Sequence, residues 1–228
     1  MENYKNLKYT LKHTTRKNSI AVVFSSDFIE IRTPKRTPNR VIQQFLEKHY
    51  LQIIKNLEKE EYFTRKYEQD EEFLIQGEAY KLNIIKSSIN NVEIYDNNLN
   101  LYVKDDLLET KIKTIYNYYK NLASLDIIRV VTKYSKIMDV SPEKVSFNKA
   151  EKRWGSCNYT SKSLNFTIRL AMVDDRIQEY IVVHELAHLI EPNHSYKFWA
   201  IVEKYIPDYK EIEQDLRKDR HKLKLSVN

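Results

Sequence analysis

The sequence predicts an α+β protein. A β-rich N-terminal region with one long helix is expected over residues 1–104, and a second domain, in which a small sheet backs a buried helix, over residues 105–228. Three patterns support this. Short β-branched runs separated by Asn, Asp, Ser and Gly fill much of the N-terminal region, as in strands and hairpins. Apolar residues recur at helical spacing after Pro38 and again after Asp106. Residues 180–190 are apolar on nearly all sides of a helix, which is typical of a buried one.

In the N-terminal region, strands are expected within residues 7–33 and 73–104, and residues 16–18 are expected to form the tip of the first hairpin. Between these segments a long helix begins, with Thr37 as its N-cap and Pro38 in its first position. The region contains no grouping of residues that suggests chemistry. We therefore expect it to recognise a substrate or partner, or only to support the fold.

The C-terminal domain is expected to begin with a helix over residues 107–139. This is longer than an average helix, so a break near Ser124 is one option. Two strands follow, the second over residues 163–172, where apolar and polar residues alternate as in a half-buried strand. After the buried helix, a helix capped by Ser195 and a charged helix over residues 209–220 complete the domain.

The buried helix carries two histidines, His184 and His188, and a glutamate, Glu185, directly after the first. Residues four apart lie on one face of a helix, so both imidazoles can reach one metal ion. Asp174 suits the N-cap of this helix, and Pro192 is expected to end it. A buried polar group needs a partner, and a metal would supply one. Two core histidines bonded to backbone carbonyls are the weaker alternative, because spacing, glutamate and apolar surroundings coincide.

A catalytic zinc usually takes three protein ligands and keeps a fourth position for water. His194, six residues after His188 and beyond the break at Pro192, is the first candidate for the third ligand. Glu203, on the next helix, is the competing candidate. Three of the six histidines fall within eleven residues, which favours His194. Glu203 is instead expected to be a solvated partner of nearby lysines.

Several motifs are shared with one family, in matching order: Arg153-Trp154-Gly155-Ser156-Cys157, Leu164-Asn165-Phe166, Arg169-Leu170, Tyr180 to Leu189, Pro192-Asn193-His194-Ser195, Phe198-Trp199 and Pro207-Asp208-Tyr209. With these motifs the sequence resembles the YgjP-like metallopeptidase family, a group of predicted zinc peptidases distantly similar to SprT-like proteases. The resemblance implies a zincin-like domain with His184, His188 and His194 as zinc ligands and Glu185 as the catalytic carboxylate. It implies no particular substrate. Residues 158–163 lack the glycine that the family often has, which leaves the shape of this turn open but not the metal site.

The predicted function is zinc-dependent hydrolysis of peptide bonds. Zinc lowers the pKa of a bound water and polarises the scissile carbonyl, while Glu185 moves the proton from that water to the leaving amine. Tyr209 and Arg169 are candidates for stabilising the oxyanion. Two alternatives stay open: a nucleic-acid-associated protein of the SprT-like kind that acts on bound partners, and a non-catalytic zinc-binding protein. Glu185 argues against the latter, since a structural zinc has no use for a carboxylate there.

Composition limits the other classes of function. The net charge is +6, but the lysines are spread along the chain without a block of five, so a solvated surface is preferred over a nucleic-acid face. Two glycines cannot build a P-loop or a Rossmann turn. No apolar run reaches the roughly 20 residues of a membrane span. The lack of an apolar N-terminal stretch and the single cysteine, Cys157, predict a cytoplasmic protein with a packed thiol. The sequence does not predict the oligomeric state.

Overall fold

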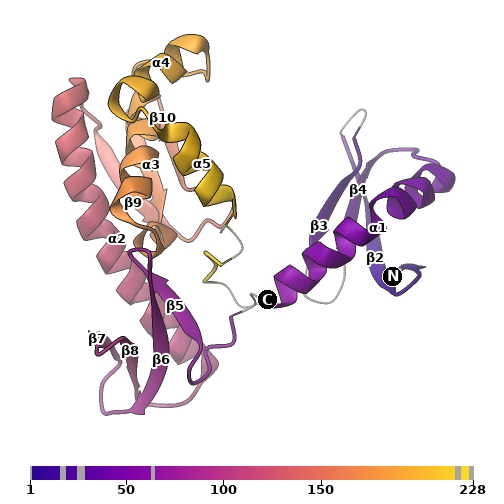
Figure 1. Ribbon diagram of the computed structural model, residues 1–228, viewed down its shortest axis with the longest axis horizontal. Coiled ribbons are helices and arrows are strands. Elements are labelled where there is room, and N and C mark those ends of the chain that lie inside the picture. Colours follow the sequence, from indigo (N-terminus) through magenta and orange to yellow (C-terminus); the bar gives the residue numbers. More distant parts are fainter. Residues whose placement is uncertain (1, 16–18, 25–28, 63–64, 219–221, 226–228) are drawn as a thin grey trace. The chain divides into compact units, whose positions relative to one another are not determined.

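The computed structural model describes residues 2–15, 19–24, 29–62, 65–218 and 222–225 of a mixed α+β chain (Figure 1). The chain divides into two compact units after Arg65, with Lys66–Leu225 as the second unit. The expected boundary between residues 104 and 105 lies inside the second unit. The reason is that the strands before residue 104 pack on the helix that follows them.

The first unit is a four-stranded sheet with one helix packed against it. The strand order is β1-β2-β4-β3. The elements are β1 (Glu2–Tyr4), β2 (Leu7–Thr14), β3 (Ala21–Phe24), β4 (Ile29–Pro34) and α1 (Asn39–Tyr62). Ile42, Leu46 and Ile53 of α1 are buried in the core of this unit. β2 pairs in parallel with β4 and is not a neighbour of β3. The predicted first hairpin is therefore wrong, and its predicted tip at residues 16–18 lies outside the described residues.

The second unit begins with another four-stranded sheet followed by a long helix. The elements are β5 (Glu72–Ile75), β6 (Glu78–Lys86), β7 (Asn91–Tyr95), β8 (Asn98–Val103) and α2 (Leu108–Met138). The strand order is β5-β6-β8-β7. α2 runs without a break through Ser124, whose hydroxyl bonds to the carbonyl of Lys120 at 2.6 Å. It ends where Asp139 takes a left-handed conformation, with φ 53°.

These two sheets have the same topology. In each, two antiparallel hairpins are joined by parallel pairing of the second strand with the fourth, and a long helix follows. The registers correspond as well: Val22 faces Ile31 in the first sheet, and Val92 faces Leu101 in the second. The chain thus contains one β-β-β-β-α module twice, first as β1 to α1 and then as β5 to α2.

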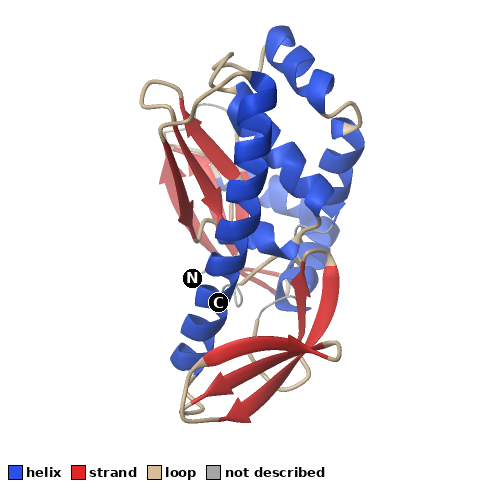
Figure 2. Cartoon of the chain, turned by 90° about the vertical axis from the view of Figure 1, so that its left-hand side faces the viewer, coloured by secondary structure: helices blue, strands red, loops and turns tan. Residues whose placement is uncertain are grey.

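The rest of the second unit is a three-stranded sheet with order β10-β11-β9, followed by helices. Figure 2 shows the strands in red and the helices in blue. The elements are β9 (Lys144–Asn148), β10 (Gly155–Asn158), β11 (Ser163–Thr167), the 3₁₀ helix η1 (Ile168–Met172), α3 (Asp175–Ala187), α4 (Tyr196–Tyr205) and α5 (Tyr209–Lys218). The strand predicted over residues 163–172 ends at Thr167, because the Thr167 hydroxyl caps η1 by accepting from the Arg169 amide.

Two sets of hydrogen bonds stabilise the second unit: one lies just before the start of α3, and the other lies where the two ends of this unit meet. At the β5–β6 turn, Gln76 and Gly77 donate their amides to carbonyls of η1, just before α3. Gly77 has φ 88°, which favours glycine at this turn. The hydroxyl of Tyr67 donates to the carbonyl of Leu225, so that the first and last residues of this unit are joined. No helix among the described residues has the length and apolar character needed to cross a membrane.

Candidate metal centre

α3 is a buried helix with a capped start. Asp174 accepts a hydrogen bond from the amide of Ile177 at 2.9 Å, which is the expected N-cap. Helical hydrogen bonding ends at Ala187, five residues before Pro192, and a turn continues the chain to Glu191. The apolar residues of α3 are buried in the second unit, and the helix contacts α2, α4, α5 and β10. The polar side chains in the last turn of α3 are therefore held in fixed positions beside β10.

Three histidines converge at the end of α3. His184 lies in its last turn, His188 is its C-cap residue, and His194 lies in the segment before α4. Their candidate ligand atoms all lie within 4.8 Å of one another, and the Nε2 atoms of His184 and His194 are 3.1 Å apart. Nδ1 of His188 is 3.4 Å from the carbonyl oxygen of Glu191, which leaves its Nε2 free to bind a metal. Glu203 is exposed on α4 and does not belong to this group.

The surroundings favour the neutral form of two of these imidazoles, those of His184 and His188. Burial, and then the proximity of His188 and His194, lower the pKa of His184 to about 3. Burial and His194 also lower the pKa of His188. A metal ligand must be a neutral imidazole with a free lone pair, so the pKa shifts favour coordination. Imidazole is a ligand that suits several transition metals, among them zinc, copper, iron and nickel.

Aromatic rings surround the three histidines and restrict their orientation. The ring of Phe198, which is fully buried, lies 4.4 to 4.9 Å from all three imidazoles. Trp199 packs on the imidazoles of His184 and His194. Trp199 also contacts Phe198 edge-on, and Tyr209 stacks on it at 5.2 Å between ring centroids. This packing supplies the rigid support that a metal site needs.

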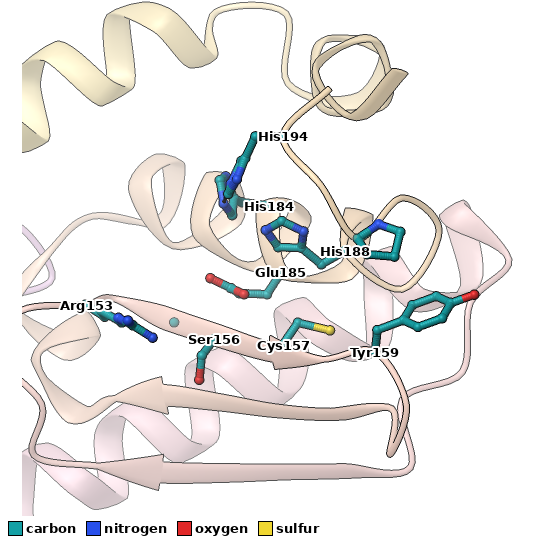
Figure 3. Close-up of a pocket in the computed structure, with 10 residues that line it drawn as sticks. Arg153, Ser156, Cys157, Tyr159, His184, Glu185, His188 and His194 are labelled. Atoms are coloured by element: carbon teal, nitrogen blue, oxygen red, sulfur yellow. Dashed lines mark hydrogen bonds between the residues drawn. The ribbon is translucent and has the colours of Figure 1, made fainter. Parts of the chain in front are cut away.

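Glu185 lies between the histidines and β10. Its side chain is buried, and burial raises its pKa to about 8, although the charge of Arg153 acts in the opposite direction. A Cβ at Gly155 would come within 2.6 Å of Glu185 Oε1. Figure 3 shows the three histidines on one side of Glu185, and Arg153, Ser156 and Cys157 on the side of β10. The carboxylate is thus held against the backbone of the strand.

Two adjoining cavities open beside this carboxylate. The first has a volume of about 410 Å³, and its lining includes the three histidines, Glu185, Arg153, Cys157 and Tyr159. The second has a volume of about 280 Å³ and is lined by Trp154, Tyr180, Leu216 and Arg217, among others. Gly155, His184 and Glu185 line both cavities. Together the two cavities form a groove beside β10, with the Glu185 carboxylate between them.

Arg169 is not available to a substrate. Its side chain donates to the carbonyls of Ala150, Glu151 and Leu223, and its guanidinium lies over the ring of Trp154 at 4.3 Å. It is 2% exposed and lines neither cavity. Arg169 therefore holds the segment before β10 in place, and the prediction that it stabilises an oxyanion is wrong. Tyr209, the other candidate, also lines neither cavity.

Arg153 is the site residue that the sequence interpretation missed. It lines the first cavity and lowers the pKa of Glu185 by its charge. One feature of the sequence could have indicated that Arg153 belongs to the site. It lies two residues before β10, in the motif that also contains Gly155. Cys157 also lines this cavity, but burial, and then the charge of Glu185, raise its pKa to about 11. Both effects favour the protonated thiol, which agrees with the prediction of a packed thiol.

Three imidazoles that share one cavity with a buried carboxylate are the arrangement of metal-dependent peptidases. Comparison with protein families agrees: the model described as "YgjP-like, metallopeptidase domain" matches residues 17–219. The chain belongs to the YgjP-like family of metallopeptidases. The recognition made from the motifs is therefore confirmed.

Two solved structures resemble part of the chain. The metallopeptidase zymogen abylysin of Pyrococcus abyssi is 22% identical, with a TM-score of 0.37, over 40% of this chain and 93% of that chain. The zymogen jannalysin of Methanocaldococcus jannaschii is 20% identical, with a TM-score of 0.38, over 41% of this chain and 95% of that chain. A search of curated proteins finds no match.

Proposed function

We propose that the protein is a zinc-dependent peptidase of the H-E-x-x-H-x5-H type. In this proposal His184, His188 and His194 hold the metal in a zincin-like domain, and the sheet of β9 to β11 backs α3. The observation that carries the proposal is that three converging imidazoles and one buried carboxylate, Glu185, line the same cavity. A structural site would be closed by a fourth ligand, whereas here an open cavity lies beside the three histidines.

Zinc held there would supply a Lewis acid for the scissile carbonyl and a water of lowered pKa. Glu185 takes a proton from the attacking water and transfers it to the leaving amine. Its burial favours the protonated form, so the carboxylate accepts that proton readily. Arg153 faces the same cavity and can hold a negatively charged part of the substrate close to Glu185.

The substrate that fits this site is an extended peptide. Among the described strands, β10 is the outer strand of its sheet and pairs with β11 alone, which leaves its other edge for another extended chain in this proposal. The groove on both sides of Glu185 follows this strand. A peptide that lay along β10 would bring a backbone carbonyl to the metal centre, with side chains in the two cavities.

The test compares the purified protein with the Glu185→Gln variant, which keeps the size of the side chain and loses its basicity. Zinc content, melting temperature and cleavage of a library of peptides and unfolded proteins are measured together. We expect zinc to be retained and cleavage to fall by at least about 100-fold, as is typical when a general base is removed. Full activity in the variant would exclude this mechanism. Loss of zinc and of the fold together would show that Glu185 is structural.

A further inference from the structure

The positive charge of the chain is concentrated in the first unit. Residues 1–65 contain 13 lysines and arginines and seven acidic residues, which gives a net charge of +6. Residues 66–228 contain 25 basic and 25 acidic residues. The first 65 residues therefore account for the whole net charge of the protein. This uneven distribution of charge is not visible from the lysines alone, because they are spread along the sequence.

Within this unit, five cationic residues occupy one end of the sheet. β2 and β4 are parallel, so both end there, and Lys12 is the register partner of Arg32 on the face opposite the core. Lys35 and Arg36 follow β4 directly, and Arg40 lies in the first turn of α1. We call these five residues the basic end. Lys35, Arg36 and Arg40 are all exposed.

One acidic residue offsets part of this charge. Glu30 lies 2.6 Å from Arg32 and 3.7 Å from Lys12, and the hydrogen bond from Arg32 lowers the pKa of its carboxyl. Glu30 therefore compensates one of the five charges and orders the Arg32 side chain. The five residues of the basic end and Glu30 together carry a net charge of +4.

The second copy of the module shows that this charge is not needed for the fold. By register, Ile85 and Tyr102 occupy the places of Lys12 and Arg32. After β8 the chain continues with Asp105 and Asp106, and Glu109 lies in the first turn of α2. The same topology is thus built with apolar and acidic residues at the equivalent positions. Residues 66–138 have ten basic and eleven acidic residues, which is near neutrality.

We propose that the basic end binds the phosphate backbone of a nucleic acid. Phosphates repeat along a nucleic acid and suit a row of Lys and Arg side chains, with Arg able to bind two phosphate oxygens at once. The basic end contains no aromatic residue for stacking on bases, so binding is insensitive to sequence. A membrane surface fits less well. In the described part of this unit the exposed large apolar side chains are Val41 and Leu51, too few for an inserting face.

The binding site belongs to the first unit alone, whereas the metal centre belongs to the second. Nucleic-acid binding is therefore expected with or without zinc. This inference goes beyond the proposed peptidase activity and does not depend on it.

The test measures binding of the full-length protein to fluorescent oligonucleotides, about 20 nucleotides long, between about 50 and 200 mM KCl. Both a single strand and a duplex are used. The variant Lys12→Gln/Lys35→Gln/Arg40→Gln removes three charges and leaves the Arg32–Glu30 pair intact. We expect affinity to fall steeply with salt in the parent protein. In the triple variant the slope of log K against log [KCl] for the single strand should decrease by about 2, or about 0.7 per lost phosphate contact.

The matched control is Lys81→Gln/Lys86→Gln/Lys104→Gln, which removes the same charge from exposed positions of the second copy of the module. We expect its affinity and salt slope to stay close to those of the parent protein. A second test variant, Lys35→Asp/Arg36→Asp, introduces the aspartates that follow β8 and should also lose binding. Melting temperatures establish that each variant is folded.

Three results would overturn the proposal. An equal loss of affinity in the basic-end triple variant and in the control triple variant would mean that binding depends only on net charge. Absence of salt-dependent binding by the parent protein would exclude a nucleic-acid site. Binding to phosphatidylserine vesicles without binding to either oligonucleotide would identify a membrane surface as the partner instead.

Discussion

The carboxylate of Glu185 lies against the α-carbon of Gly155, so closely that a Cβ at residue 155 would come within 2.6 Å of Oε1. The group that approaches this glycine is the proposed general base. β10 therefore holds Glu185 in place through its backbone, in addition to the proposed binding of a peptide along its edge.

The first prediction concerns this contact. Gly155→Ala should displace the Glu185 carboxylate, because the buried side chain has little room to move. We expect zinc binding to persist and peptide cleavage to fall by about 100-fold, the effect of a displacement of about 1 Å in an active site. Zinc content and kcat/KM measure the two effects. Ser156→Ala on the same strand, which removes an atom rather than adding one, is the control. Unchanged cleavage in Gly155→Ala would contradict the proposed role of Glu185.

The second prediction concerns the third ligand. Purified protein should contain about one zinc per chain. His194→Ala should weaken zinc binding strongly, since it removes one of three converging nitrogens. Glu203→Ala should have little effect, because this residue is exposed on α4. Metal analysis after dialysis against a chelator distinguishes the two variants. The ligand assignment is wrong if the Glu203→Ala variant has lost its zinc and the His194→Ala variant has kept it.

The third prediction concerns the pH dependence of the stability of metal-free protein. Burial raises the pKa of Glu185 from 4.5 to about 8, so the unfolded chain releases this proton at a lower pH than the folded one. The folded protein should therefore lose stability as the pH rises from about 4.5 to about 8. Glu185→Gln removes this loss, and its melting temperature should exceed that of the parent protein by more at pH 8 than at pH 5.

His184, with a depressed pKa, is present in both proteins and does not enter the comparison in the first approximation. Adding zinc should reduce the pH dependence, because a nearby cation favours the ionised carboxylate. The same difference in melting temperature at both pH values would show that the carboxyl is not buried in solution.

The fourth prediction concerns the division of the chain. A fragment of residues 66–225 should fold and bind zinc by itself. A fragment that begins at Asp105 should not fold, because it removes the hydrogen bonds of Leu74 with Tyr119 and of Gln76 with Ala171. Circular dichroism melting and zinc content test both fragments. Equal cleavage by the 66–225 fragment and the full chain would show that the first unit does not recognise the substrate.

The parts of the fold that depend on local sequence were predictable. The metal-binding pattern is local, since two of the histidines share one helix and His194 follows after a short turn. Strand and helix segments were located because their periodicity is local too. The pairing of β2 with β4 was missed, since a parallel pair between distant segments leaves no mark on either strand. The repeated module was missed for a related reason: its two copies share register but differ in their residues, such as Tyr9 and Leu82.

The role of Arg169 could not be predicted for a different reason. Its place in an alternating run suggested an exposed side chain, whereas its acceptors come from residues 150–151 and from Leu223, more than 50 positions away. A sequence shows which side chains need partners, but only the fold brings the partner carbonyls together. Arg153 was hidden for the same reason, because the buried carboxylate beside it lies on another element.

The hydrogen bond from Tyr67 to Leu225 makes the second unit a nearly closed loop of chain. A polypeptide whose ends meet can be circularly permuted: a short peptide could join residue 225 to residue 66, and new ends could be opened at an exposed turn outside the cavity lining, such as residues 88–90. The metal centre would be unaffected by such a change. The three histidines and Glu185 all belong to this closed stretch of chain, so a permuted second unit would keep the complete set of candidate site residues.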